Sequence, residues 1–302
     1  MERSVIRALE EHGPLSGCVL RDTLQADDFG LWKACMRSDR IQVTRVGRRY
    51  LRLDRKVGGY ARLSPSILRE FLTYSVVSLT EDSASLRVGT AELADHIAKV
   101  NATKLKIVQR IVGKIGSRVR LTDRTAEEHY CILLGGDVVY GMAHDAPRTE
   151  HSTGLMVRGS DLDLVIITAD DAPEEVARQL DETIHQEKHR QLSNPASREE
   201  IDYVVKPLSR VREQAAFDTF RHMVACKILQ EAILVFGNAQ LHESATALLT
   251  EEGIPERLVE LEAKAVEARK RAEDRLLARD EDSLVGEDKY LFHTSEETEE
   301  FE

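Results

Sequence analysis

Residues Gly159–Ile167 read GSDLDLVII, with two carboxylates, Asp161 and Asp163, placed two residues apart where an apolar, β-branched run begins. Alternate side chains of a β-strand point to the same face, so these two carboxylates are expected to project together. Mg²⁺ takes one or two carboxylates together with oxygens of a bound phosphate, which makes the pair a candidate metal site. The simpler interpretation is a strand entered through a polar turn, because a lone Asp-x-Asp is a common pattern.

On the upstream side, the apolar run Cys131–Leu134 is followed at once by Gly135 and Gly136. A strand that ends in paired glycines and opens into a short helix lets backbone N–H groups approach a phosphate. Paired glycines also make ordinary turns, so this feature by itself is weak. We therefore expect a strand, a glycine turn and a short helix here.

On the downstream side, Glu200–Pro207 predicts a further strand that ends at its proline. Asp202 lies among apolar residues of this strand, where an ionised carboxylate needs a partner or a metal. Between the two strands, Ala172–Arg190 predicts a helix with Pro173 near its start and acidic residues in its first turn. The predicted order is strand, glycine turn, strand with the Asp pair, helix, and strand with a third Asp.

This order resembles the DNA polymerase β-like nucleotidyltransferase superfamily. Its members share a glycine-containing turn, an acidic pair on the next strand and a third carboxylate on a later strand. The matching residues here are Gly135 and Gly136 for the turn, Asp161 and Asp163 for the pair, and Asp202 for the third acid. The resemblance covers about Tyr130–Arg210 and implies an α+β, palm-like domain with a small mixed β-sheet and flanking helices.

The resemblance implies transfer of a nucleoside monophosphate from an NTP to an acceptor hydroxyl by a two-metal mechanism. The three aspartates would hold Mg²⁺, with Mn²⁺ as the alternative ion, and Asp202 would also act as the base for the acceptor hydroxyl. Contacts with the nucleotide are expected from Gly135, Gly136, Ser160 and Lys227. Losing one metal-bound acid is expected to nearly abolish turnover.

Two features depart from the family pattern. The interval between the glycine turn and the Asp pair is long, so residues 143–158 are expected to form an inserted loop. Asp137 also stands near the place of a phosphate-binding serine, where a carboxylate would repel a triphosphate. Both departures concern the nucleotide contacts and leave the three aspartates in place.

The first 80 residues predict a winged helix-turn-helix domain. Its third helix is expected to carry Leu31, Trp32 and Met36 inward. The following strands are expected to form a β-hairpin about Gly47 and Arg48. The predicted helices are Glu2–Glu11, Cys18–Leu24 and Asp27–Ser38, and the predicted strands are Ile41–Val46 and Arg49–Leu53.

A winged helix of this kind binds nucleic acid through its third helix and its hairpin. Basic side chains on these two elements would contact bases and phosphates. They are Lys33 and Arg37 on the outer side of the helix, and Arg45, Arg48, Arg49 and Arg52 on the hairpin. The alternative is a winged helix used only for protein contacts, with solvated arginines.

We expect three domains: the winged helix at 1–80, the catalytic domain with its leading helix at 81–210, and a helical domain with an acidic tail at 211–302. Further helices are expected over Thr90–Lys114, Ala215–Phe236 and Glu256–Arg279, and Ser295–Glu302 is expected to be disordered. The basic residues of the first of these helices, Lys104 among them, are expected to form a solvated face.

The composition argues against a membrane-spanning or secreted protein. The chain has 302 residues, no apolar run long enough to span a membrane, and no signal peptide. Its four cysteines are scattered, which is typical of a reducing compartment, and we expect a cytoplasmic protein. Residues 1–130 carry an excess of seven positive charges and residues 131–302 an excess of 18 negative charges, which suggests separate partners.

His185 and His189 have the helical spacing of zinc ligands, but Gln186 stands where a metalloprotease needs Glu, so a solvent-facing helix surface is the preferred interpretation. Two alternatives to an active transferase remain. One is a DNA-binding transcriptional regulator whose transferase-like domain senses a nucleotide or is inactive. The other is an interaction module, such as one half of a toxin–antitoxin or phage-defence pair. The acceptor could be RNA, a protein or a small molecule.

Overall fold

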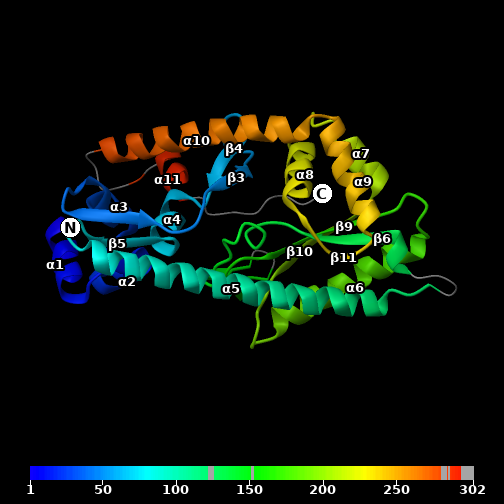
Figure 1. Ribbon diagram of the computed structural model, residues 1–302, viewed down its shortest axis with the longest axis horizontal. Coiled ribbons are helices and arrows are strands. Elements are labelled where there is room, and N and C mark those ends of the chain that lie inside the picture. The colour runs from blue at the N-terminus through cyan, green and yellow to red at the C-terminus, as the bar shows by residue number, and fades with distance from the viewer. Residues whose placement is uncertain (122–125, 151–152, 280–283, 285, 294–302) are drawn as a thin grey trace. The chain divides into compact units, whose positions relative to one another are not determined.

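The computed structural model describes residues 1–121, 126–150, 153–279, 284 and 286–293. The fold is mixed α+β with several small sheets, as expected. The chain divides into two compact units (Figure 1). The first unit comprises Met1–Ala98 and Leu261–Thr298, and the second is built from Lys99–Glu260. The predicted boundaries at residues 80 and 210 stay predictions.

The first unit begins with three short helices, at the places that the sequence predicts. These are α1 (Glu2–His12), α2 (Gly17–Leu24) and α3 (Asp28–Arg37). Asp27 caps α3, because its side chain accepts a hydrogen bond from Gly30 N at 2.7 Å. Apolar residues of all three helices form one core with Phe71 and Val77.

The sheet of the first unit is antiparallel and has the order β1-β5-β2. Its strands are β1 (Leu15–Ser16), β2 (Ile41–Arg45) and β5 (Ser75–Leu79). The predicted hairpin about Gly47 and Arg48 is wrong, since β2 pairs with β5. The reason lies in the apolar register: Ile41 faces Leu79 and Val43 faces Val77, a match that local sequence does not show.

The second half of the predicted hairpin pairs elsewhere. The strand β3 (Tyr50–Leu53) pairs with β4 (Ala61–Ser64) as a separate two-stranded sheet. The helix α4 (Ile67–Thr73) follows and is capped by Ser66, whose side chain accepts a hydrogen bond from Arg69 N at 3.3 Å. The first unit is completed by the later part of α10 (Ile254–Ala278) and by α11 (Glu287–Phe292).

The second unit is built around a four-stranded mixed sheet of order β10-β9-β6-β11. Its strands are β6 (Tyr130–Leu134), β9 (Leu162–Thr168), β10 (Ile201–Pro207) and β11 (Ile233–Gly237). The strand β9 is parallel to β10 and antiparallel to β6. These elements confirm the predicted order of strands around the Asp pair.

One face of this sheet packs against two helices, α5 (Ser83–Arg118) and α6 (Glu174–Ser193), which lie side by side (Figure 1). Apolar side chains of both helices share one core with alternate residues of β6 and β9. Glu187 of α6 is buried and lies 3.6 Å from Lys114 Nζ and 3.5 Å from Arg118 Nη1 of α5. The sheet and these two helices therefore form two layers that share one apolar core.

The remaining elements of the second unit precede, separate or follow the strands of this sheet. They are the 3₁₀ turn Ala126–His129, β7 (Pro147–Thr149), β8 (Met156–Arg158), α7 (Leu208–Gln214), α8 (Phe220–Glu231) and α9 (Ala239–Glu251). The inserted segment 143–158 contains the β7–β8 hairpin. The predicted helix Ala215–Phe236 is wrong at both ends, because it begins at Phe220 and its last residues form β11, which pairs with β6.

The other predicted helices are confirmed with shifted ends: α5 extends beyond Thr90–Lys114, and α10 replaces Glu256–Arg279. The tail Ser295–Glu302 lies outside the described residues. Among the helices of the described ranges, none combines the length and the apolar character that a membrane crossing requires.

Candidate metal centre

Three carboxylates meet near the beginnings of the neighbouring strands β9 and β10 of the second unit's sheet. Asp163 lies in β9 and faces Asp202 of the parallel strand β10, and Asp161 directly precedes β9. One carboxylate oxygen from each lies within 4.8 Å of the other two. Asp163 is buried, whereas the side chains of Asp161 and Asp202 are 18% and 24% exposed. The sheet register therefore brings together the three acids that the sequence predicts, with access from solvent.

Two basic side chains lie against this acid cluster. Arg148 Nη2 of β7 is 3.4 Å from Asp161 Oδ2, and Lys188 Nζ of α6 is 2.8 Å from Asp202 Oδ1. Opposite charges at such distances lower the repulsion among the carboxylates. A divalent cation bound by the three acids would compete with Arg148 and Lys188 for the same oxygens.

The glycine turn after β6 supports Asp163 directly. Gly135 N donates a hydrogen bond to Asp163 O at 2.9 Å. At Gly136, φ is +69° and an added Cβ would lie 1.9 Å from Asp163 Oδ2, so a side chain there would be strained and would displace this carboxylate. The short helix expected after the glycines is wrong: residues 137–141 form consecutive turns, with Val139 N bonded to Gly136 O and Gly141 N to Val138 O.

Asp137 and Ser160 are bonded to each other. Ser160 Oγ donates to Asp137 Oδ2 at 2.7 Å and accepts from His144 N at 3.2 Å. Both side chains are buried. Asp137 therefore holds the loop before Asp161, and the hydroxyl of Ser160, which we expected to contact a nucleotide, has this structural partner.

The buried Lys227 contacts a carboxylate at the glycine turn. Its Nζ lies 2.7 Å from Glu231 Oε2, one turn further along α8. Glu231 Oε1 also accepts a hydrogen bond from Gly136 N at 3.2 Å, and Tyr140 OH donates to Glu231 Oε2. A backbone N–H, an ammonium and a hydroxyl thus converge on one anion. Glu231 was not predicted from the sequence, although it lies four residues after Lys227 on the same helix face.

Arg148 and Glu200 were also missed. Arg148 Nη2 lies 2.7 Å from Glu200 Oε2, and Arg148 Nε donates to Gly159 O at 2.8 Å. Burial raises the pKa of Glu200 to about 7, with Arg148 opposing the shift and Asp202 and Asp161 adding to it. No sequence signal marks Arg148, because the hairpin that carries it lies in a segment expected to be a loop.

The basic residues predicted to bind nucleic acid are placed differently from the expectation. Lys33, expected on the outer side of α3, is only 5% exposed, whereas Met36, expected inside, is 42% exposed. Arg37 Nε donates to Leu277 O at 2.9 Å, and its Nη2 donates to Arg279 O at 2.9 Å. The outer placement of Lys33 and the inward placement of Met36 are wrong, because the end of α10 and α11 share a core with α3.

The four arginines that were expected on the hairpin fall into two groups. Arg52 is buried, and Arg49 bonds Glu70 at 2.6 Å and Glu273 at 2.8 Å. Arg45 and Arg48 are exposed. Of these four arginines, Arg45 and Arg48 have the exposed position that contacts with phosphates require.

The pair His185 and His189 lies on the exposed side of α6, with the Nε2 atoms 3.0 Å apart. The expected solvent-facing placement is confirmed. Within the described ranges, the one group of three or more possible metal ligands is the aspartate cluster.

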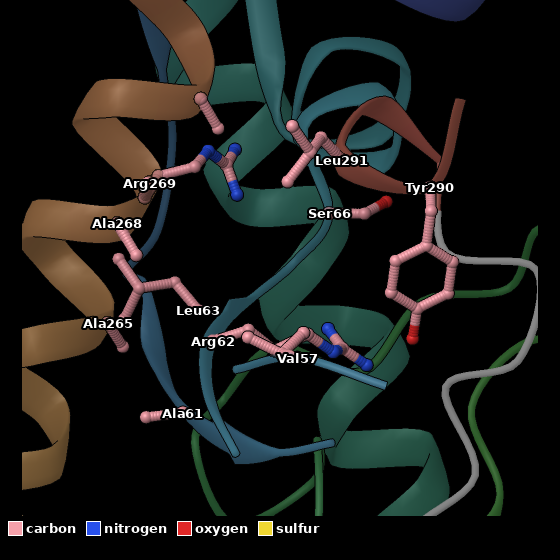
Figure 2. A pocket seen from close by; sticks show the side chains of 11 residues that line it. Val57, Ala61, Arg62, Leu63, Ser66, Ala265, Ala268, Arg269, Tyr290 and Leu291 are labelled. Carbon is pink, nitrogen blue, oxygen red and sulfur yellow. The ribbon is translucent and has the colours of Figure 1, made fainter. Parts of the chain in front are cut away.

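The first unit contains a mainly apolar pocket. Figure 2 shows the alanines of α10 along one side and the ring of Tyr290 across from them. Its charged groups are paired, since Arg62 Nε lies 3.0 Å from Asp54 Oδ2 and Arg269 Nε lies 2.6 Å from Glu273 Oε1. The pocket therefore offers space but no reactive group.

A comparison of the chain with models of protein families gave no match, and a comparison with curated proteins gave no significant match.

Proposed function

We propose that the chain is a Mg²⁺-dependent nucleotidyltransferase that moves a nucleoside monophosphate from an NTP to an acceptor hydroxyl. One observation carries this proposal: Asp161, Asp163 and Asp202 offer oxygens within 4.8 Å of one another beside the glycine turn. Three carboxylates with solvent access form a hard oxygen donor set, which suits Mg²⁺ or Mn²⁺. The order of strands around them resembles that of the DNA polymerase β-like superfamily, and this resemblance supports the proposal.

The chemistry proposed for each residue follows from its place. Asp161, Asp163 and Asp202 would hold the metal, which when bound polarises the phosphoryl group and lowers the pKa of the acceptor hydroxyl. Asp202, as one of the two more exposed acids, would take the proton of an entering hydroxyl. The contribution of the protein is then positioning and charge neutralisation.

The donors that surround Glu231 support a phosphate subsite at the glycine turn. Gly136 N–H, Lys227 Nζ and Tyr140 OH are the kinds of group that bind phosphate oxygens, and here they bind a carboxylate. A triphosphate at this turn would have to take the place of Glu231 on the Gly136 N–H. The carboxylate of Asp137, which is expected to repel a triphosphate, accepts a hydrogen bond from the Ser160 hydroxyl.

We propose that the first unit is a winged helix, which is supported by the position of β1 between α1 and α2 and by the pairing of β2 and β5 after α3. We propose that β3, β4 and α4 are inserted between the two strands of its wing. A nucleic-acid contact by this unit would rest on Arg45 and Arg48. R45A/R48A should then weaken retention on nucleic acid, and equal retention would oppose this role.

The transfer activity can be tested with the purified protein, Mg²⁺ and each α-labelled NTP, alone and with cellular RNA or protein. We expect label on an acceptor, or released pyrophosphate, which is lost in Asp163→Asn. Asp171→Asn, the same change on an exposed turn, should keep the activity. No turnover with any mixture, despite nucleotide binding, would favour the alternative of a nucleotide-sensing regulator.

A further inference from the structure

Lys104 of α5 is a buried cation with three oxygen partners. Lys104 is 3% exposed. Its Nζ lies 2.6 Å from Arg158 O, 2.7 Å from Ser160 O and 2.5 Å from Glu199 Oε2. An ammonium group has three N–H donors, so each donor of Lys104 has an acceptor. A buried charge is tolerated only when it is satisfied in this way.

The three acceptors belong to two separate segments of the chain. Arg158 and Ser160 precede Asp161, and Glu199 lies three residues before Asp202. The β9–β10 ladder begins only at Leu162 and Ile201, so Lys104 bonds both segments just ahead of the paired strands. The segments are further joined by a backbone hydrogen bond from Arg158 N to Arg198 O at 3.1 Å.

We propose that Lys104 is a positioning residue that fixes the distance between the metal ligands Asp161 and Asp202. Asp161 follows the Lys104-bound carbonyl of Ser160 directly, and it precedes the β9 ladder, so the ladder does not hold it. A ligand set must be held within fractions of an ångström to bind a metal tightly, which requires support of this kind. The inference rests on the proposed function, because it presumes that the aspartates bind a metal.

Electrostatics and positioning make opposite predictions for the loss of Lys104. Removing a positive charge near three carboxylates strengthens the binding of a divalent cation by Coulomb's law. Loosening the loop that carries Asp161 weakens that binding. The direction of the change in metal affinity therefore separates the two effects when Lys104 alone is lost. When the charge of Glu199 is lost as well, the two Coulomb effects oppose each other, and a weaker affinity indicates the loss of positioning.

The test uses the full chain, Mn²⁺ as the probe and electron paramagnetic resonance to count free ions. Lys104→Met leaves Glu199 buried without its partner, and that variant can fail to fold. The double variant K104M/E199L removes both charges at constant net charge and fills the space with apolar groups, so it is expected to keep the fold. Lys106→Met, on the exposed side of the same helix, is the matched control.

We expect the dissociation constant for Mn²⁺ to rise about tenfold or more in K104M/E199L, with an unfolding midpoint in urea like that of the wild type, while K106M binds as the wild type does. Wild-type affinity in the folded double variant would overturn the positioning role and leave the metal site intact. Failure of the wild-type chain to bind Mn²⁺ would instead overturn the proposed function, and the positioning role with it.

Discussion

At Gly136 the backbone conformation and the space beside Asp163 both demand glycine. The residue has φ of +69°, and an added Cβ would overlap Asp163 Oδ2 at 1.9 Å. Gly141 also has φ of +69°, but no atom within 4 Å would meet its Cβ. A side chain would be strained at either position because of the positive φ. At Gly136 alone it would also clash with the carboxylate of Asp163.

Gly136→Ala is therefore expected to displace Asp163 and to weaken Mn²⁺ binding by about tenfold or more, which corresponds to about 1.4 kcal/mol. Gly141→Ala should cost stability of the order of 1 kcal/mol from strain alone and leave Mn²⁺ binding unchanged. Titration with Mn²⁺ and urea unfolding of both variants measure the two effects. Equal affinities in the two variants would show that Asp163 is not held by the glycine turn.

Lys206 is a second residue whose environment has a measurable consequence. It is buried in β10 and donates to Gln214 Oε1 at 2.6 Å. Burial lowers its pKa from 10.5 to about 8, with Cys226 opposing the shift and Arg210 adding to it. Between these two pKa values the unfolded chain binds a proton that the folded chain lacks, so the free energy of unfolding rises with pH in this window.

This rise is expected to reach up to about 3 kcal/mol between about pH 8 and about pH 10.5. Urea unfolding at both ends of the window measures it. Lys206→Met should remove this part of the pH dependence, and Lys106→Met, which changes an exposed lysine, should retain it. A slope that is the same in all three proteins would mean that Lys206 stays protonated in the folded chain.

At the scale of elements, the contact between α5 and β11 depends on another glycine. A Cβ at Gly116 would lie 2.2 Å from Phe236 Cζ, whereas a Cβ at Gly113 would meet nothing within 4 Å. The ring of Phe236 stacks on Tyr130 with centroids 6.2 Å apart, so it cannot move without losing that contact. The close approach of helix and strand therefore needs Gly116.

Gly113→Ala should stabilise the protein by about 0.5–1 kcal/mol, because alanine favours the helix. Gly116→Ala gains the same preference but must displace Phe236, and we expect a net loss of about 1–2 kcal/mol. The free energies of unfolding in urea give the difference. Equal stabilisation by both changes would contradict the packing of β11 against α5.

Element by element, the sequence predicts what is local and misses what is not. The strands β6, β9 and β10 could be predicted because apolar runs, glycines and a proline mark their ends. The pairing of β2 with β5 could not, since the partner strand lies some thirty residues further along and the nearer β3 has the same character. The residues of β11 continue an apolar helical pattern, and only the open edge of β6 makes them a strand.

At the scale of the whole molecule, the first unit combines the amino-terminal helices with α11, which lies far along the chain. Phe292 of α11 packs against Phe29 and Trp32 of α3, with ring centroids 5.3 Å and 5.4 Å apart. Trp32 is the single tryptophan of the chain and is buried. Its fluorescence therefore reports on the contact between α11 and α3.

Phe292→Ala is expected to cost about 3 kcal/mol in the first unit and to shift the emission of Trp32 to the red. Val266→Ala changes an exposed position of α10. It should change the free energy of unfolding by no more than about 0.5 kcal/mol and leave the emission of Trp32 where it is. The measurement is urea unfolding followed by tryptophan fluorescence. Unchanged emission and stability in F292A would contradict the docking of α11.

The candidate site shows the same division between what could and could not be predicted. The three aspartates were found because each belongs to its own strand and the strands are marked in the sequence. Lys104 was expected on a solvated face, although its spacing of four residues before Val108 and seven before Ile111 places it on the buried stripe of α5. Arg148 and Glu231 come from distant segments, and only the folded chain brings them to the acids.

The binding of Mn²⁺ by the full chain tests the central claim most directly. Electron paramagnetic resonance of the wild type should show bound ions, and Asp161→Asn, Asp163→Asn and Asp202→Asn should each lose them, while Asp171→Asn keeps them. Binding that is absent from the wild type, or that survives all three changes, would contradict a metal centre at these aspartates.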